Sequence, residues 1–176
     1  MSTRILLVRA VNVGGAKLPM AEFREMLAEL GGENVRTYIA SGNAVLDVPG
    51  NAAEFDRSVE KALTAKYGYT REVISRSPQE LDAALKAHPF EVSEPKYSYI
   101  APLTGNPTKE AAAKAQEIGT GEDQWALIGN DLHIRYANGA GRAELDMNKV
   151  LKRLGVQGTA RNLNTVQALP EMAAKG

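Results

Sequence analysis

The sequence predicts an α+β protein built from two lobes that share one order of elements. Apolar residues at helical spacing alternate along the chain with short runs of branched aliphatic residues, and glycine, proline and asparagine separate the segments. The order strand, helix, strand, strand, helix, strand occurs in the first half of the chain and again in the second half. With 176 residues, the chain is long enough for two small domains.

Six elements are expected in the first lobe. Arg4–Val11 is rich in Leu, Ile and Val and predicts a strand, which a glycine-containing loop follows. Pro19 suits the first turn of a helix that ends at Gly31-Gly32. Two strands, Val35–Ser41 and Ala44–Val48, should follow, joined by a tight turn. Asn51 and Glu54 form a capping box that opens a second helix, Asn51–Tyr67, and the last strand is Thr70–Ser75.

A connecting helix and a second set of six elements follow. Ser77 and Glu80 form a capping box with Pro78 at the first helical position, and the helix ends at Pro89. The second lobe then begins with a strand and a helix capped by Thr108. The expected strands of this lobe are Tyr97–Leu103, Asp123–Ile128, Leu132–Tyr136 and Thr159–Arg161. Its second helix should be Leu145–Leu154, and a closing helix should be Thr165–Ala174.

This βαββαβ order is the split βαβ arrangement of ferredoxin-like folds. We therefore expect two ferredoxin-like lobes with antiparallel sheets, a connecting helix and a C-terminal helix. The predicted domains are residues 1–75 for the first lobe, 76–92 for the connecting helix and linker, and 93–176 for the second lobe with its C-terminal helix.

Composition and motifs argue against several classes of function. Lys and Arg together number 21, as do Asp and Glu, so a basic field over the whole chain is absent. The chain has no cysteine, and His88 and His133 have no metal-binding spacing, so neither a metal nor a cofactor is expected. We expect His88 to cap or pack at a helix end. His133 alternates with Leu132 and Ile134 along a strand, so we expect it to face opposite to them, at the surface. No nucleophile motif or acid–base pair indicates a reaction, so the sequence does not decide whether the chain is an enzyme.

The start of the sequence and its apolar segments bear on location. The N-terminus enters a strand directly and lacks the layout of a signal peptide. No apolar run approaches the roughly 20 residues that span a bilayer. We therefore expect a cytoplasmic protein that does not enter a membrane; the sequence predicts no particular oligomeric state.

One candidate binding site lies in the second lobe. In the split βαβ arrangement, the loop after the third strand shares an end of the sheet with the exit of the fourth strand. Glycine amides, a helix N-terminus and two guanidinium groups could converge there on a phosphate or a carboxylate. The predicted residues are Asn138, Gly139, Gly141, Arg142, Arg161, Asn162, Asn164 and Thr165. Alternatively, Arg161 and Asn162 pair with acids and cap the last helix.

A second candidate cluster lies in the first lobe. The loop after the first strand and the hairpin between the second and third strands should lie at the same end of the sheet. The residues are Asn12, Gly14, Gly15, Ser41, Gly42 and Asn43. The alternative is that Gly14 and Gly15 only turn the chain, since they form no dinucleotide or P-loop motif, and that Ser41–Asn43 is a hairpin turn.

Ferredoxin-like sheets also bind RNA by stacking bases on aromatic residues of the first and third strands. The corresponding strands of the first lobe contain no aromatic residue. The second lobe has Tyr97, Tyr99, Trp125 and Tyr136, whose alternation fits packing as well as stacking, and Trp125 is expected in a core or lobe contact. Nucleic acid therefore remains a partner only through phosphate contacts at the loops.

The combination of these segments resembles the bacterial domain of unknown function family 1697. The matching residues are Arg9, Asn12–Gly15, Asn34–Ile39, Ser41–Asn43, Asn138-Gly139, Gly141-Arg142, Thr159, Arg161-Asn162 and Asn164-Thr165. The resemblance implies paired ferredoxin-like lobes and no particular reaction. Leu163 stands where the family usually has tryptophan, and Ala143-Glu144 replace a Ser-Lys pair, which removes a hydroxyl and a cation from the predicted site of the second lobe.

These features lead to three hypotheses for function. The first is a binding module for an anionic, phosphate-bearing ligand such as a nucleotide, a sugar phosphate or a nucleic-acid end. The second is an enzyme of nucleotide or phosphoryl chemistry in which arginines stabilise charge. The third is a structural or protein-interaction module that associates through sheet faces or edges.

Overall fold

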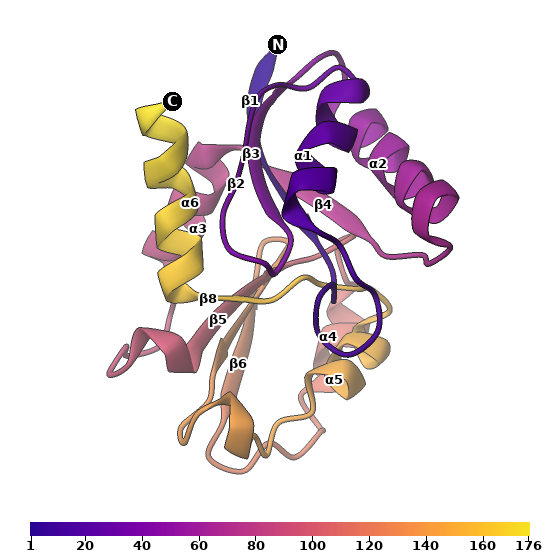
Figure 1. Cartoon of the computed structure of the whole chain (residues 1–176). Coiled ribbons are helices and arrows are strands. Elements are labelled where there is room, and N and C mark those ends of the chain that lie inside the picture. Colours follow the sequence, from indigo (N-terminus) through magenta and orange to yellow (C-terminus); the bar gives the residue numbers. More distant parts are fainter. The chain divides into compact units, whose positions relative to one another are not determined.

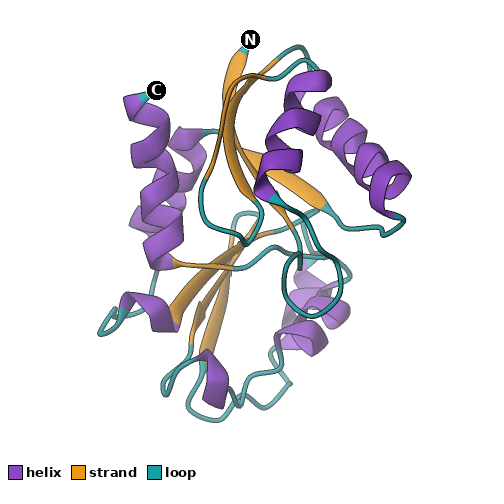
Figure 2. Ribbon diagram, in the orientation of Figure 1, coloured by secondary structure: helices purple, strands orange, loops and turns teal.

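The structure is a computed structural model that describes residues 1–176. The chain divides into two compact units, one formed by Met1–Asp82 with Ala168–Gly176 and the other by Ala83–Gln167. Each unit contains one four-stranded antiparallel sheet with two helices packed on it (Figures 1 and 2). The predicted fold class, two ferredoxin-like α+β lobes, is confirmed.

The first sheet has the strand order β2-β3-β1-β4, with every neighbouring pair antiparallel. Its strands are β1 (Ser2–Val8), β2 (Glu33–Thr37), β3 (Asn43–Val48) and β4 (Val73–Arg76). Helices α1 (Met20–Glu29) and α2 (Ala52–Tyr67) cover one face, which Figure 2 shows clearly. Because side chains alternate along β1, Leu6 and Val8 point to that face and pack with Phe23 of α1 and Val59 of α2.

The second sheet repeats this topology in the order β6-β7-β5-β8. Its strands are β5 (Ser98–Pro102), β6 (Gln124–Ile128), β7 (Asp131–Arg135) and β8 (Arg161–Asn162), and its helices are α4 (Lys109–Ala115) and α5 (Met147–Leu154). Trp125, Leu132 and Ile134 pack with Leu151 in one apolar cluster. Of the two expectations for Trp125, a core or a lobe contact, the structure shows packing in the core of this lobe.

Four further helical segments complete the chain. These are α3 (Pro78–Ala87), the 3-10 turns η1 (Pro95–Tyr97) and η2 (Ala140–Arg142), and α6 (Leu163–Lys175). The C-terminal part of α6 groups with the first unit, where Arg36 Nη1 of β2 donates to Met172 O at 2.7 Å. No helix is both long enough and apolar enough to cross a membrane.

Three of the helix starts that the sequence predicted are confirmed by hydrogen bonds. Asn51 Oδ1 accepts from Glu54 N at 3.0 Å, and Thr108 Oγ1 accepts from Ala111 N at 3.0 Å. At the start of α3 the capping box is reciprocal: Ser77 Oγ accepts from Glu80 N at 3.1 Å, and Glu80 Oε1 accepts from Ser77 N at 2.9 Å. Local capping chemistry therefore fixed these three boundaries.

Other boundaries differ from the prediction. The first strand ends at Val8 rather than Val11, because Ala10 adopts a left-handed conformation with φ of 53°. The helix expected from Leu145 begins at Met147, because Asp146 Oδ1 accepts from Lys149 N at 3.1 Å and so caps it. The closing helix begins at Leu163, two residues earlier than expected.

Candidate functional site

The loop after β1 and the connection between β2 and β3 meet at one end of the first sheet (Figure 1). Asn12 Nδ2 donates to Ala40 O at 2.6 Å and to Leu18 O at 2.8 Å, while Asn12 Oδ1 accepts from Leu18 N at 2.8 Å. Val8 N donates to Gly42 O at 2.9 Å. The structure therefore brings together the two halves of the first-lobe cluster, the loop after β1 and the connection between β2 and β3. The hydrogen bonds of the Asn12 side chain join them.

The hairpin half of this cluster has its own internal contacts. Asn43 is fully buried, and its Nδ2 donates to Tyr38 O at 3.0 Å and to Ser41 Oγ at 2.8 Å. Gly42 has φ of 88°, and a Cβ on it would lie 2.7 Å from Val11 Cγ2. The connection therefore needs glycine both for its conformation and for its close approach to the loop after β1.

Left-handed backbone conformations are concentrated at this end of the sheet. Ala10, Asn12 and Ile39 have φ of 53°, 58° and 48°, and Gly14 has φ of 88°. Such angles are uncommon for residues other than glycine, and least expected for a β-branched side chain such as Ile39. Strained backbone of this kind is typical of loops that serve a function.

A pocket of about 460 Å³ opens beside the loop and is lined by Asn12, Gly14, Gly15, Ala16, Lys17 and Pro19. Pro19 precedes α1, and no side chain caps the first turn of that helix. The acid of this turn, Glu22, accepts from Tyr67 Oη at 2.6 Å and pairs with Lys66 Nζ at 3.3 Å. These hydrogen bonds, the one from Tyr67 above all, hold the pKa of Glu22 below its usual range.

The cations near the loop differ in how they are engaged. Arg9 is held by Glu72, with Nε at 2.6 Å and Nη2 at 3.2 Å from the two carboxylate oxygens. Arg71 Nε reaches Ala10 O at 3.4 Å, and its guanidinium lies over the Tyr69 ring at 5.6 Å. The Lys17 side chain is exposed. The loop therefore carries one exposed cation, Lys17, and a second, Arg71, contacts the residue Ala10 that precedes it, whereas the charge of Arg9 is already compensated.

The loop of the second-lobe cluster is organised around an internal carboxylate. Asp123 is only 4% exposed, and it accepts from Ala137 N at 2.9 Å, Glu144 N at 2.7 Å and Leu145 N at 3.0 Å. Asn138 Nδ2 donates to Glu122 Oε2 at 3.1 Å. Backbone amides on both sides of Gly139 and Gly141 therefore already donate to a carboxylate of the protein itself, that of Asp123.

The two arginines of that cluster lie in different environments. Arg142 ends the turn η2, which also contains Gly141, and is exposed. Arg161 is 8% exposed in β8, and its Nη1 donates to Ala160 O at 3.1 Å. Burial lowers the pKa of Arg161 to about 10. Arg161 pairs with Ile100 and so faces away from the apolar cluster of this lobe.

The remaining residues of the second-lobe cluster surround the start of α6. Asn162 Oδ1 accepts from Thr165 N at 3.1 Å, which is a helix cap, and Thr165 is buried while Asn164 is exposed. Gly139 has φ of 87° and lies against the Tyr97 ring. An anion site at this place stays a prediction.

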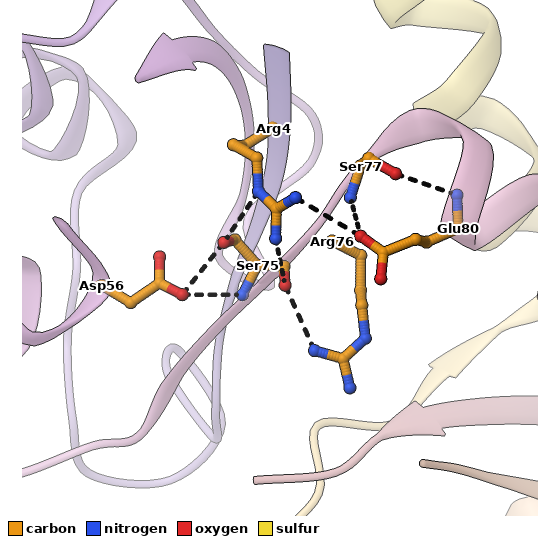
Figure 3. A network of polar contacts seen from close by, with 6 residues as sticks. All are labelled: Arg4, Asp56, Ser75, Arg76, Ser77 and Glu80. Carbon is orange, nitrogen blue, oxygen red and sulfur yellow. Dashed lines mark hydrogen bonds and ion pairs between the residues drawn. The ribbon is translucent and has the colours of Figure 1, made fainter. Parts of the chain in front are cut away.

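A buried polar network in the first lobe was not foreseen from the sequence (Figure 3). Asp56 of α2 is 6% exposed, and its Oδ2 accepts from Ser75 Oγ at 2.9 Å and from Ser75 N at 3.2 Å. Arg4 donates from Nε to Ser75 Oγ at 3.2 Å and from Nη2 to Ser75 O at 3.0 Å, and its Nη1 pairs with Glu80 Oε1 at 3.3 Å. The network therefore links the interior of the lobe to the capping box of α3.

The Asp56 carboxyl is not fully satisfied by this network. Its Oδ1 is buried and has no hydrogen-bond partner, and burial raises the pKa of Asp56 to about 6 despite the hydrogen bond from Ser75. A sequence signal for it exists: Asp56 stands three and seven residues before Val59 and Leu63, so it lies on the apolar stripe of α2.

The two histidines form a pair inside the second unit. His133 is fully buried, and its Nδ1 lies 2.9 Å from Nδ1 of His88. The expectation of a surface histidine is wrong, because the residues after α3, His88 and Phe90, cover this face of β7. The chain contains no group of three or more metal-ligating side chains that could hold a metal ion.

One solved structure shares the fold of this chain. A solved structure of the conserved bacterial protein SP0830 from Streptococcus pneumoniae is similar with a TM-score of 0.76 and 23% identity, over 99% of each chain, which supports the fold alone. The structure of a candidate glycine cleavage system transcriptional repressor, 13% identical over 90% of this chain and 95% of that chain, has a TM-score of 0.23, too low to carry an argument. No curated protein matches the chain.

The family comparison covers the first-lobe cluster and ends before the second. The model of the family described as "Protein of unknown function (DUF1697)" matches residues 1–133. The matched part contains Asn12–Gly15 and Ser41–Asn43, whereas Asn138–Thr165 lies beyond it. Because the match spans more than half of the chain, the chain belongs to the DUF1697 family.

Proposed function

We propose that this protein binds an anionic, phosphate-bearing ligand at the loop Asn12–Pro19 of the first lobe. The observation that carries the proposal is the pocket of about 460 Å³ formed by this loop, in which glycine backbone adjoins Lys17. Glycine leaves the amide groups accessible, and an ammonium group at the rim supplies the opposite charge to a phosphate.

The start of α1 adds to the attraction. The N-terminal amides of a helix carry partial positive charge and favour an anion. Pro19 is the N-cap residue of this helix and lines the pocket, and no side chain accepts a hydrogen bond from the amides of the first turn. Glu22, the acid of the first turn, is engaged by Tyr67 and Lys66, which limits its repulsion of a bound anion.

Preorganisation also supports a site here. The three hydrogen bonds of the Asn12 side chain join the start of the loop to Leu18 near its end and to Ala40 of the neighbouring connection, before any ligand arrives. A loop that is already ordered loses less conformational freedom on binding, so more of the interaction energy appears as affinity. At the second-lobe cluster, by contrast, Asp123 already accepts hydrogen bonds from Ala137, Glu144 and Leu145.

Titration with inorganic phosphate, followed by backbone amide NMR shifts, tests the proposal directly. We expect the largest shifts at Gly14, Gly15 and Lys17. Lys17→Ala should weaken binding, and Gly15→Glu should abolish it, because a Cβ at Gly15 meets open space and the added carboxylate would repel the anion. Lys61→Ala, which removes an exposed lysine from α2, serves as the matched control.

Two results would count against this assignment. Phosphate binding that is unchanged in Lys17→Ala and Gly15→Glu would remove the first-lobe loop as the site. Loss of binding in an Arg142→Ala, Arg161→Ala double variant, with the Lys17 variant unaffected, would move the site to the second lobe.

A further inference from the structure

We infer that the ligand of the Asn12–Pro19 pocket is a nucleoside monophosphate, which carries a single phosphate and a flat aromatic base on one sugar. This inference rests on the proposed function and selects among phosphate-bearing ligands.

The size of the pocket exceeds that of the phosphate alone. Small-molecule sites have volumes of roughly 300–1,000 Å³, and this pocket has about 460 Å³. Inorganic phosphate would leave most of that space to water. The ligand that fits therefore has a body in addition to its anionic group.

The walls of the pocket offer little to a body rich in hydroxyl groups. Gly14, Gly15, Ala16 and Pro19 present only backbone and hydrocarbon. The polar side chains that line the pocket are those of Lys17 and Asn12. The amide oxygen and both amide hydrogens of Asn12 already form hydrogen bonds within the protein. The hydroxyl groups of a sugar gain no partners from these walls, so the sugar of a bound ligand stays toward water. A sugar phosphate alone therefore gains little beyond its phosphate contacts, and tighter binding needs a further group on the sugar.

Two exposed apolar side chains belong to this loop and to the connection tied to it. Val13 lies between two lining residues and is 69% exposed, and Ile39 is 54% exposed on the neighbouring connection. The hydrogen bond from Asn12 Nδ2 to Ala40 O ties these two segments together. Branched aliphatic side chains held in water on ordered loops can cover the face of a planar ring, which removes apolar area of both partners from water.

The charge near the loop fits one phosphate group. Lys17 lines the pocket, and Arg71 contacts Ala10, two residues before the loop, so two positive charges lie on or next to it. Arg9 is compensated by Glu72. A phosphate monoester carries up to two negative charges at neutral pH. A triphosphate or a nucleic-acid strand would bring more charge than these side chains offset.

The decisive experiment compares four ligands by isothermal titration calorimetry: inorganic phosphate, ribose 5-phosphate, adenosine 5′-monophosphate and adenosine 5′-triphosphate. We expect the monophosphate to bind about tenfold more tightly than ribose 5-phosphate, from the apolar area that its base buries. Val13→Ser should remove most of this ratio and leave the affinity for ribose 5-phosphate unchanged. Ile39→Ser is a second variant of the same kind, and Val92→Ser, at another exposed valine, is the control.

The outcomes separate this inference from the proposed function. Equal affinities for ribose 5-phosphate and the monophosphate, or a ratio that survives both Val13→Ser and Ile39→Ser, would overturn the nucleotide inference and leave anion binding intact. Tighter binding of the triphosphate would overturn the single-phosphate argument. If none of the four ligands binds, the proposed function itself fails.

Discussion

Nδ1 of His88 and Nδ1 of His133 lie 2.9 Å apart. A hydrogen bond between two imidazole nitrogens requires one ring to donate and the other to accept, so the accepting ring is neutral. His133 is fully buried, and the Nε2 atoms of both rings are buried without hydrogen-bond partners. The pair therefore fits the folded protein only while at least one ring remains unprotonated.

This pair predicts that stability falls in mild acid. Burial, with a smaller contribution from His88, lowers the pKa of His133 from 6.5 to about 4, and burial lowers that of His88 as well. Protons therefore bind more readily to the unfolded chain, so the stability is fully present above pH 6.5 and is lost as the pH falls toward 4. Arg161, across Ile100 in the same row of the sheet, adds a positive charge on this face.

Urea unfolding of the wild type and of His133→Leu at pH 7.5, 5.5 and 4.5 measures the effect. A shift from 6.5 to about 4 corresponds to roughly 3 kcal/mol, which is the upper limit of the loss in the wild type. The leucine variant should lose distinctly less stability over this range. Parallel pH profiles of the two proteins would show that the pair does not titrate as its geometry implies.

The burial of Asp56 leads us to expect a pH dependence of stability that is opposite in sign to that of the histidine pair. Its pKa is raised from 3.8 to about 6, mainly by burial, so the folded protein holds this proton more tightly than the unfolded chain. The stabilisation is present below pH 3.8 and is lost as the pH rises through 6, because a charged carboxylate is then buried. The neighbouring charges that favour the carboxylate, Arg57 on α2 and Arg4 on β1, do not offset the burial.

Asp56→Asn removes this titration. The free energy of unfolding of the variant, relative to the wild type, should rise between pH 4.5 and pH 8 by up to roughly 3 kcal/mol. Chemical denaturation at several pH values measures the difference, with Glu29→Gln as the control because Glu29 is an exposed acid of α1. A difference between variant and wild type that stays constant with pH would show that the buried carboxyl does not titrate in this range.

Asp123 predicts a strong loss of stability that a small anion can partly restore. Its carboxylate accepts from three backbone amides of the segment that follows β7. Asp123→Ala leaves these donors without a partner, which should cost about 2–4 kcal/mol. The midpoint of thermal unfolding should then rise with added formate in the variant and not in the wild type. Glu122→Ala, next to it and exposed, should change little; no response of the Asp123 variant to formate would mean that water replaces the carboxylate.

The parts of this structure that the sequence predicted are those set by neighbouring residues. The capping box of Ser77 and Glu80 needs only a spacing of three residues, and both partners are found bonded as expected. The end of the sheet shared by Asn12 and Gly42 follows from the strand order, so the topology alone placed these loops together. The residues whose environment the sequence did not predict depend on partners that are distant along the chain.

His133 and Asp123 illustrate why. Alternation along β7 correctly placed His133 on the opposite face from Leu132, but only the fold reveals that His88, 45 residues earlier, covers that face. Asp123 gains its amide partners from positions up to 22 residues away, through a turn that no motif marks. By contrast, Asp56 could have been found, since it interrupts the apolar stripe of α2 three residues before Val59.

Gly42 and Gly14 allow the close contact between the two loops to be measured separately from backbone strain. Both have φ of 88°, so replacement by alanine costs each about 1 kcal/mol from the left-handed conformation. At Gly42 the new Cβ would also lie 2.7 Å from Val11 Cγ2 and 3.2 Å from Val8 Cβ, whereas at Gly14 it meets open space. Gly42→Ala should therefore destabilise the protein by about 1–3 kcal/mol more than Gly14→Ala, as overpacking of a buried contact does. Thermal or urea denaturation of the two variants measures this difference directly. Equal losses would mean that the connection shifts away from β1 at little cost, and the fixed end of the sheet on which the proposed pocket depends would then be absent.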